Sequence, residues 1–494
     1  MSRQHREPVI FVVSNRLPVT VTRTDDNTYD VSSSSGGLVG ALQGFAGSTE
    51  FRWYGWPGLE IPEQHRAMVE EKLATQKAYP IFFNKALEDK HYNGFSNKIL
   101  WPLLHYQADQ IHISKEDWTA YQEVNRAFAE SIGSEAEDGD IIWIQDYHLL
   151  LMPQYLRQVF GDGKRIRIGF FLHTVFPSSD FFRILPVRKD LLESLLHCDL
   201  VGFHNQDYTH HFLDCCTKFL HLDTSGSQVI FQDRKVNLLT SPVGIDPSEF
   251  RKLLDRSDVK QRVQGLKEKY KGVQLIISVD RLDYIKGIPL RIEAMDAFLT
   301  KYPNYADKVV LLQVVIPSRE DVKDYRGLHN QINQAVSRVN EKHGPVDMMP
   351  IHSLFSSVSK AELAALYAVS DVCIVSSIRD GFNMVSLEYV VCQREHHGVL
   401  LLSEFAGASE VLDESVSINP WDTDEFADAI QCALTMGREE KTARWESLNK
   451  RVEQFTSKRW GEAFLELLKN SDHGHTARHG VANGAVDCAS CMLE

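Results

Sequence analysis

The sequence predicts an α/β protein built on two doubly wound parallel sheets. Short apolar runs alternate with amphipathic helical stretches, a pattern typical of parallel sheets with helices on both faces. A segment with two prolines and one glycine, residues 240–247, divides the apolar runs into two sets. The length of 494 residues also exceeds the size at which a single core stops growing.

The first set of apolar runs predicts buried strands at residues 9–14, 141–144, 168–172 and 200–203. The polar, turn-rich residues 20–35 are predicted to be a mobile surface loop. Because residues 240–247 suit a linker between sheets, we place the first domain at residues 1–243.

The second set predicts strands at residues 275–279, 309–316 and 372–375, with helices between them at residues 289–299 and 360–369. We place this second domain at residues 244–455. A last amphipathic helix is predicted at residues 456–468, within a closing segment of residues 456–470. The polar remainder, residues 471–494, predicts a disordered tail.

Composition and charge exclude several classes of protein. Lys and Arg number 53 against 67 Asp and Glu, a formal net charge of −14, and no long basic run offsets it, so no nucleic-acid partner and no membrane partner is expected. The longest apolar run is too short to span a bilayer, and the N-terminus lacks the pattern of a signal peptide.

Six cysteines lack metal-ligand spacing and are predicted to be buried, reduced thiols, namely Cys198, Cys215, Cys216, Cys373, Cys392 and Cys432. Cys488 and Cys491 form a lone C-x-x-C without a second pair of ligands. The sequence therefore predicts a soluble, cytoplasmic protein.

Polar residues that directly follow the predicted strands indicate the chemistry of the site. Ligands of open α/β sheets bind beyond the carboxyl ends of the strands. Four basic residues occupy such positions, namely Arg16, Arg281, Lys286 and Arg319. Together they predict an anionic small molecule as the ligand.

Two further segments suit phosphate groups. Gly36 and Gly37 open a helical stretch, where backbone N–H groups can approach a phosphate, although a simple tight turn is an equal alternative. Arg281 and Lys286 fall in one short loop, from which they can neutralise a departing diphosphate without a metal. The sequence contains neither the glycine pattern of a nicotinamide-binding domain nor that of a P-loop.

The segment from Asp380 to Glu388 places two acids seven residues apart across a strand–loop–helix junction. Asn383 is predicted to cap the helix, leaving the amides near Met384 available to an anion. An acidic cap region followed by a solvated glutamate is the alternative. The pair Asp138 and Asp140 precedes its strand and so points to the wrong sheet edge for a sugar-nucleotide metal. We therefore expect no metal site.

Several long motifs resemble the trehalose-6-phosphate synthases, glycosyltransferases of family 20, and most closely the fungal catalytic form. The resemblance runs from about residue 9 to about residue 468 and rests on residues 12–18, 36–37, 53–58, 143–148, 169–173, 280–287 and 379–388. It implies a GT-B fold, with two Rossmann-like domains facing a cleft and a C-terminal helix crossing back. It also implies retaining transfer of glucose from UDP-glucose to glucose 6-phosphate, with no cofactor.

The resemblance also implies roles for individual residues. The acceptor phosphate would be held by Arg16, Tyr92, Trp101 and Arg319, and an acceptor hydroxyl by Asp146. The donor diphosphate would be held by Arg281 and Lys286 above Gly36 and Gly37, with His173 beside the transferring glucosyl carbon. Donor glucose and ribose would bind Asp380, Gly381, Phe382, Asn383, Met384, Val385, Ser386, Leu387 and Glu388, with Glu388 on the ribose hydroxyls. Asp146, His173, Arg281 and Lys286 would form the catalytic set.

Family resemblance further implies a homo-oligomer and a complex with a trehalose-phosphate phosphatase or regulatory subunits. Three alternatives to an active synthase are a catalytically dead sugar-phosphate sensor of the same fold, a retaining transferase with another acceptor, and a nicotinamide dehydrogenase. The presence of Arg16, Asp146, Arg281, Lys286 and Glu388 disfavours the sensor, and Tyr92, Trp101 and Arg319 disfavour another acceptor.

Overall fold

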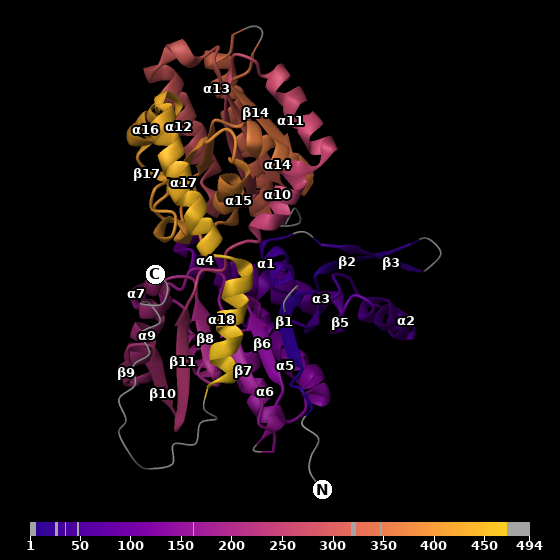
Figure 1. Ribbon diagram of the computed structural model, residues 1–494. Coiled ribbons are helices and arrows are strands. Elements are labelled where there is room, and N and C mark those ends of the chain that lie inside the picture. The colour runs from indigo at the N-terminus through magenta and orange to yellow at the C-terminus, as the bar shows by residue number, and fades with distance from the viewer. Residues whose placement is uncertain are drawn as a thin grey trace.

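The computed structural model has two lobes, each organised around its own sheet (Figure 1). It describes residues 6–24, 28–34, 36–46, 49–161, 163–317, 323–345 and 348–471. The N-terminal lobe lies below the C-terminal lobe in this view, and the last helix returns to the lower one. The two doubly wound parallel sheets expected from the sequence are confirmed.

Within the described residues the first sheet has the order β5–β4–β1–β6–β7–β8–β11–β10–β9. All pairs up to β11 are parallel, and β10 runs antiparallel to both of its neighbours. The strands are β1 (Ile10–Arg16), β4 (Arg52–Trp56), β5 (Ala78–Pro80), β6 (Ile141–Gln145), β7 (Arg167–Phe171), β8 (Leu200–Phe203), β9 (Thr224–Ser225), β10 (Gln228–Phe231) and β11 (Arg234–Thr240).

Alternate side chains of β1 enter different cores, because successive residues of a strand point to opposite faces. Phe11 and Val13 pack with α5 (Lys115–Glu135), α6 (Met152–Phe160), α8 (Arg188–Leu195) and α9 (Gln206–Leu220). Ile10 and Val12 face α1 (Gly37–Ala46), α2 (Glu63–Ala74) and α18 (Ser457–Lys469). Helices therefore cover both faces of the first sheet.

The second sheet has the order β14–β13–β12–β15–β16–β17, and all its pairs are parallel. Its strands are β12 (Gln274–Arg281), β13 (Val309–Ile316), β14 (Ile351–Phe355), β15 (Val372–Val375), β16 (Val399–Ser403) and β17 (Val416–Ile418). One face packs on α12 (Ile288–Lys301), α13 (Lys323–His343) and α16 (Thr423–Thr435). The other packs on α10 (Pro247–Asp255), α11 (Ser257–Lys269), α14 (Lys360–Val369), α15 (Met384–Cys392) and α17 (Arg438–Gln454).

Both sheets reverse their strand order beside their first strand, at β1/β6 and at β12/β15. Such switch points are where open α/β sheets bind ligands. The shorter helices are α3 (Lys85–Asp89), the π-helix η1 (Lys90–Leu100), α4 (Trp101–Leu104) and α7 (Ser179–Phe182), with 3₁₀ turns at η2 (Ala108–Gln110), η3 (Tyr147–Leu149), η4 (Tyr284–Lys286), η5 (Pro303–Tyr305) and η6 (Gly407–Glu410).

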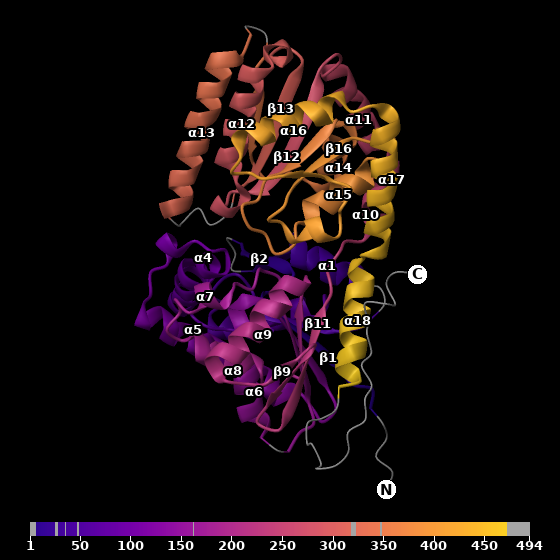
Figure 2. The same cartoon turned by 90° about the vertical axis from the view of Figure 1, so that its left-hand side faces the viewer.

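The chain passes between the lobes twice, and the two passages lie side by side. Ile245 bridges Thr456, and the Ser457 N–H donates to the Ile245 carbonyl at 3.1 Å. A Cβ on Gly244, which has φ +63°, would lie 2.1 Å from the Phe455 oxygen, so the close approach requires glycine. Helix α18 then runs along the first lobe (Figure 2), where Phe464 stacks on Trp143 with ring centroids 4.7 Å apart.

Several expectations need correction. Residues 20–35 are not simply a loop, because β2 (Val19–Arg23) and β3 (Tyr29–Ser33) form an antiparallel hairpin whose Val21 and Tyr29 are buried. Cys432 is exposed, whereas the other five cysteines expected to be buried are so. The strands β4, β5, β9, β10, β11, β14, β16 and β17 were not predicted. Of the expected tail, residues 471–494, only Ser471 is among the described residues, and it is buried with its hydroxyl donating to the Leu468 carbonyl.

Candidate active site

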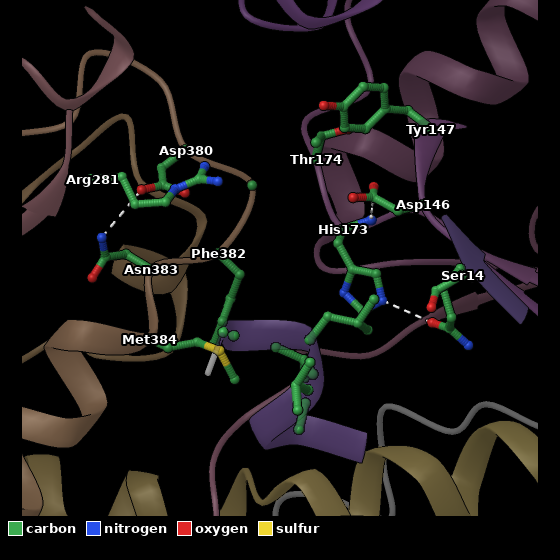
Figure 3. Close-up of a pocket in the computed structure, with 18 of the residues that line it drawn as sticks. Ser14, Asp146, Tyr147, His173, Thr174, Arg281, Asp380, Phe382, Asn383 and Met384 are labelled. Carbon is green, nitrogen blue, oxygen red and sulfur yellow. Dashed lines mark hydrogen bonds between the residues drawn. The ribbon is translucent and has the colours of Figure 1, made fainter. Parts of the chain in front are cut away.

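A cavity of about 640 Å³ lies between the carboxyl ends of the two sheets. Figure 3 shows Asp146 and His173 of the first lobe facing Arg281 and Asp380 of the second across it. All the described residues predicted for the site line it, except Ser386 and Leu387, which are fully buried within α15. Arg319 lies outside the described residues. The predicted site residues that the structure describes therefore lie together at one place in the fold.

On the first lobe, Arg16 ends strand β1 and lies between two aromatic rings. Its guanidinium carbon is 5.1 Å from the centroid of Trp56 and 5.4 Å from that of Tyr92. Glu88, whose side chain is only 1% exposed, lies 3.7 Å from the guanidinium and 2.5 Å from the Lys85 ammonium. The rings and the carboxylate together hold the cation at the cavity wall.

The segment η1 brings Tyr92 to this cation. It is a π-helix, a conformation that is rare and frequent at functional sites. Tyr92 stacks on His148 with ring centroids 5.6 Å apart. At the following turn the Trp101 indole nitrogen lies 3.5 Å from the Asp283 carboxylate of the other lobe, and its ring lies 5.7 Å from the Arg281 guanidinium carbon. Trp101 thus joins the two walls.

Asp146 follows β6 in a backbone conformation unusual for a residue other than glycine, with φ +69°. Its carboxylate accepts the backbone N–H of His173 at 3.1 Å. Burial raises the pKa of Asp146 to about 6, although the two backbone N–H donors and the nearby Arg281 oppose the rise. The strained backbone conformation of Asp146 persists where the surrounding structure over-determines it, which is common at active sites.

On the second lobe, Lys286 and Asp380 form an ion pair at 2.6 Å, with side chains 11% and 10% exposed. The same Asp380 oxygen accepts from Ser377 and Asn383 at 3.0 and 3.1 Å. Burial works against the charge, but Lys286 and these donors hold the pKa of Asp380 below its usual value. Arg281, by contrast, is half exposed and lies 3.9 Å from Asp283.

Helix α15 begins at the cavity, and the predicted cap is confirmed, since the Asn383 side chain accepts the Ser386 N–H at 3.1 Å. Glu388, one turn along the helix, accepts from the Tyr367 hydroxyl at 3.3 Å. Burial raises the pKa of Glu388 to about 7. Glu388 thus lines the cavity and is hydrogen-bonded by Tyr367.

The lobes touch directly at this site. The Tyr208 hydroxyl of α9 donates to the Asp380 carbonyl at 3.2 Å. A Cβ on Gly381 would lie 2.3 Å from the His173 carbonyl oxygen, so only glycine allows this approach. The loop that carries Asp380 and Gly381 is thus in contact with the loop that carries His173.

Some lining residues were not given a role from the sequence, among them Ser34, Trp53 and His105. Trp56, Glu88 and Lys85 were also missed, because only the fold brings α3 beside β1 and β4.

Among the described residues, no group of three or more His, Cys, Asp or Glu side chains could hold a metal ion. Asp138 and Asp140 instead accept from Arg165 and from Arg6 and Val9, at the opposite edge of the sheet. Nor does any helix in the described ranges have the length and apolarity to cross a membrane.

Comparison with known proteins identifies a group to which these features belong. Residues 8–470 match the sequence model of a family described as Glycosyltransferase family 20. An alpha,alpha-trehalose-phosphate synthase [UDP-forming] 1 of Aspergillus niger is 50% identical over 96% of this chain and 92% of its own length. A structure described as trehalose-6-phosphate from E. coli bound with UDP-2-fluoro glucose superposes with a TM-score of 0.84 at 33% identity, covering 93% of this chain and 99% of its own. A UDP-forming alpha,alpha-trehalose-phosphate synthase of Burkholderia xenovorans, in complex with glucose-6-phosphate, has a TM-score of 0.84 at 30% identity and covers 94% of this chain and 100% of its own.

Proposed function

The chain belongs to glycosyltransferase family 20, and from this premise we propose that it transfers glucose from UDP-glucose to glucose 6-phosphate. The products are α,α-trehalose 6-phosphate and UDP, and the configuration at the transferred carbon is retained. The observation that carries the proposal is the convergence of basic and hydroxyl-binding groups from both lobes on one cavity. The chain has the GT-B fold, with the candidate site between its two Rossmann-like sheets.

The second lobe offers the groups that a nucleotide sugar requires. Arg281 and Lys286 supply two positive charges for the diphosphate, and Gly36 and Gly37 line the same cavity from the first lobe, at the start of α1. The α15 junction offers Asp380 and the amides that follow Asn383 to the glucose, and Glu388 to the ribose hydroxyls. Ser386 and Leu387 act as the buried support of that junction.

The first lobe offers the groups that an acceptor phosphosugar requires. Arg16, Tyr92 and Trp101 form one wall of the cavity, and Arg319 is expected to join them from the other lobe. Asp146 would accept a hydrogen bond from an acceptor hydroxyl. Its raised pKa means that this contact strengthens as pH rises through about 6.

The arrangement favours transfer on one face of the sugar. A covalent route would need a carboxylate nucleophile beside a second acid about 5 Å away. Asp146 is tied to the His173 backbone, and Asp380 is tied to Lys286, Ser377 and Asn383. In the proposed step the bond between glucosyl carbon and diphosphate breaks as the acceptor oxygen bonds to that carbon, and the acceptor proton passes to the departing phosphate. Arg281 and Lys286 stabilise the charge that develops there.

A donor-and-acceptor panel with purified protein tests the proposal. UDP-, ADP- and GDP-glucose are each combined with glucose 6-phosphate, glucose and fructose 6-phosphate, and disaccharide phosphate is measured. Product from UDP-glucose and glucose 6-phosphate is expected. Absence of transfer with every pair would favour a catalytically dead sensor, and binding of glucose 6-phosphate without turnover would identify it.

We expect activity to survive exhaustive chelation. Arg281 and Lys286 both line the cavity where we propose that the diphosphate departs, so we expect them to neutralise its charge without a divalent ion. Turnover measured after dialysis against EDTA should stay within about twofold of the untreated enzyme. Complete loss that Mg²⁺ or Mn²⁺ restores would contradict this leaving-group chemistry.

We expect UDP-glucose binding to release protons near neutral pH. The pKa of Glu388 is about 7 in the free protein, and ribose hydroxyls that donate to it would stabilise the ionised form. Binding would therefore lower this pKa, release roughly half a proton at pH 7, and strengthen as pH rises through 7. Calorimetry in two buffers of different ionisation enthalpy measures the release. Glu388→Gln should abolish it, and an unchanged release would remove Glu388 from the ribose site.

The proposal extends to the surroundings of the enzyme. The five buried, unpaired cysteines suit a reducing compartment, so we place the enzyme in the cytoplasm. The family resemblance supports self-association and a complex with a trehalose-phosphate phosphatase or regulatory subunits. Light scattering and co-purification from cell extract test the two separately.

A further inference from the structure

Gln145 is the last residue of β6, its side chain is wholly buried, and it contacts His173. Its amide oxygen lies 2.9 Å from the His173 Nε2 atom (Figure 3 draws this bond as a dashed line from the ring). The amide nitrogen of Gln145 is buried and makes no hydrogen bond in the structure. Such a group is costly to bury, so its retention at the cavity wall calls for a reason.

Three rings pack against the ring of His173 on the sides that do not face the cavity. Phe171 lies 4.8 Å away, His204 5.3 Å and Trp460 of the returning helix α18 5.6 Å, measured between ring centroids. The backbone N–H of His173 is bound by Asp146, and its carbonyl lies against Gly381. Packing therefore fixes the position of the His173 ring. The contact with Gln145 in addition determines which ring nitrogen carries the proton.

We propose that Gln145 is a positioning residue that keeps His173 neutral with its proton on Nε2, so that Nδ1 accepts a hydrogen bond from a hydroxyl of the transferred sugar. The inference rests on the proposed glucosyl transfer. An amide oxygen can only accept, so a ring nitrogen that contacts it must donate. In a neutral imidazole the other nitrogen is then an acceptor.

The charged surroundings are consistent with a neutral ring. Burial, with a contribution from His204, lowers the pKa of His173 well below its usual value. The titratable groups around the ring are Asp146 on the first lobe, His204 at the end of β8, and the Lys286–Asp380 pair beside Gly381. The lysine and the aspartate of that pair offset each other, and Asp146 meets the backbone of His173 rather than its ring.

Two variants of Gln145 separate this role from simple packing. Gln145→Glu keeps the shape and the accepting oxygen, but its negative charge stabilises protonated His173 and raises the pKa of the ring. As pH falls through that raised pKa, Nδ1 gains a proton and can no longer accept. The kcat of Gln145→Glu should therefore decline on the acid side at a higher pH than that of wild type. Because the added charge also raises the pKa of the adjacent Asp146, the protonation of His173 itself is followed by ¹⁵N NMR of the imidazole. Gln145→Leu removes the acceptor and should lower kcat on the order of tenfold at every pH.

The experiment is a pH profile of kcat from 5.5 to 9 for the wild type and both variants, with thermal unfolding of each protein measured in parallel. If the amide nitrogen of Gln145 instead donates to the His173 ring, only a protonated glutamate can take its place. The kcat of Gln145→Glu would then rise as pH falls. Equal losses in both variants without a shifted acid limb would reduce Gln145 to a packing residue. Either result overturns the inference, whereas a wild type without glucosyl transfer overturns the proposed function itself.

Discussion

Replacing Lys286 with alanine should lower kcat by about 10²–10³-fold while changing the affinity for UDP much less. The negative charge on the diphosphate grows as the bond to glucose breaks, so a cation held beside it contributes most in the transition state. The Lys286 ammonium is held 2.6 Å from Asp380 by a short turn that ends at Gly287. Steady-state kinetics and UDP titration measure the two effects separately.

The ion pair complicates this variant, and two controls resolve the complication. Without Lys286 the buried Asp380 loses its counter-charge, so its pKa should rise and the fold should lose stability. Lys286→Arg keeps the charge and should recover part of the rate. Lys301→Ala breaks an ion pair of the same 2.6 Å length with Asp428, far from the cavity, and should leave kcat unchanged. Near-normal turnover of folded Lys286→Ala would remove this lysine from the mechanism.

The strands that could be predicted are those buried on both faces. Strands β1, β6 and β13 consist mostly of apolar residues, because helices cover both sides of a parallel sheet. Strand β17 spans only three residues, and β4 contains an arginine and a glycine among its aromatic residues, so neither gives a clear signal. The β2–β3 hairpin was missed because turn residues concealed its alternating pattern.

The site could be predicted where it follows from topology. Asp146 and Arg281 lie at the ends of strands beside the switch points, so their meeting follows from the parallel order. The environment of Arg16 could not be predicted, since Trp56 comes from a neighbouring strand and Glu88 from a helix more distant in sequence. The pairing of Lys286 with Asp380 likewise depends on how two loops of the second lobe approach each other.

Recognition of the acceptor phosphate should account for the second large effect, which is on kcat/KM for the acceptor. The wild type should use glucose 6-phosphate better than glucose by about 10²–10⁴-fold in kcat/KM, because each lost charged hydrogen bond costs roughly 1.5–3 kcal/mol. Arg16→Ala should remove much of that preference by crippling the use of glucose 6-phosphate, while slow transfer to glucose and the binding of UDP-glucose stay nearly intact. Arg319→Ala is expected to act in the same direction. Initial rates with both acceptors measure the ratio.

The chain offers a matched control for the arginine at 16. Arg52 also stacks on two aromatic rings, Phe11 at 5.9 Å and Tyr79 at 5.6 Å, and it also lies near a carboxylate, Glu135 at 3.8 Å. It lines no part of the cavity, so Arg52→Ala should leave the preference between the two acceptors unchanged. A loss of preference confined to Arg16→Ala would then come from the charge at the cavity wall and not from a lost stack of arginine on aromatic rings. Equal efficiency of the wild type with glucose and glucose 6-phosphate would refute the phosphate pocket, and with it the trehalose 6-phosphate product, whatever the donor proves to be.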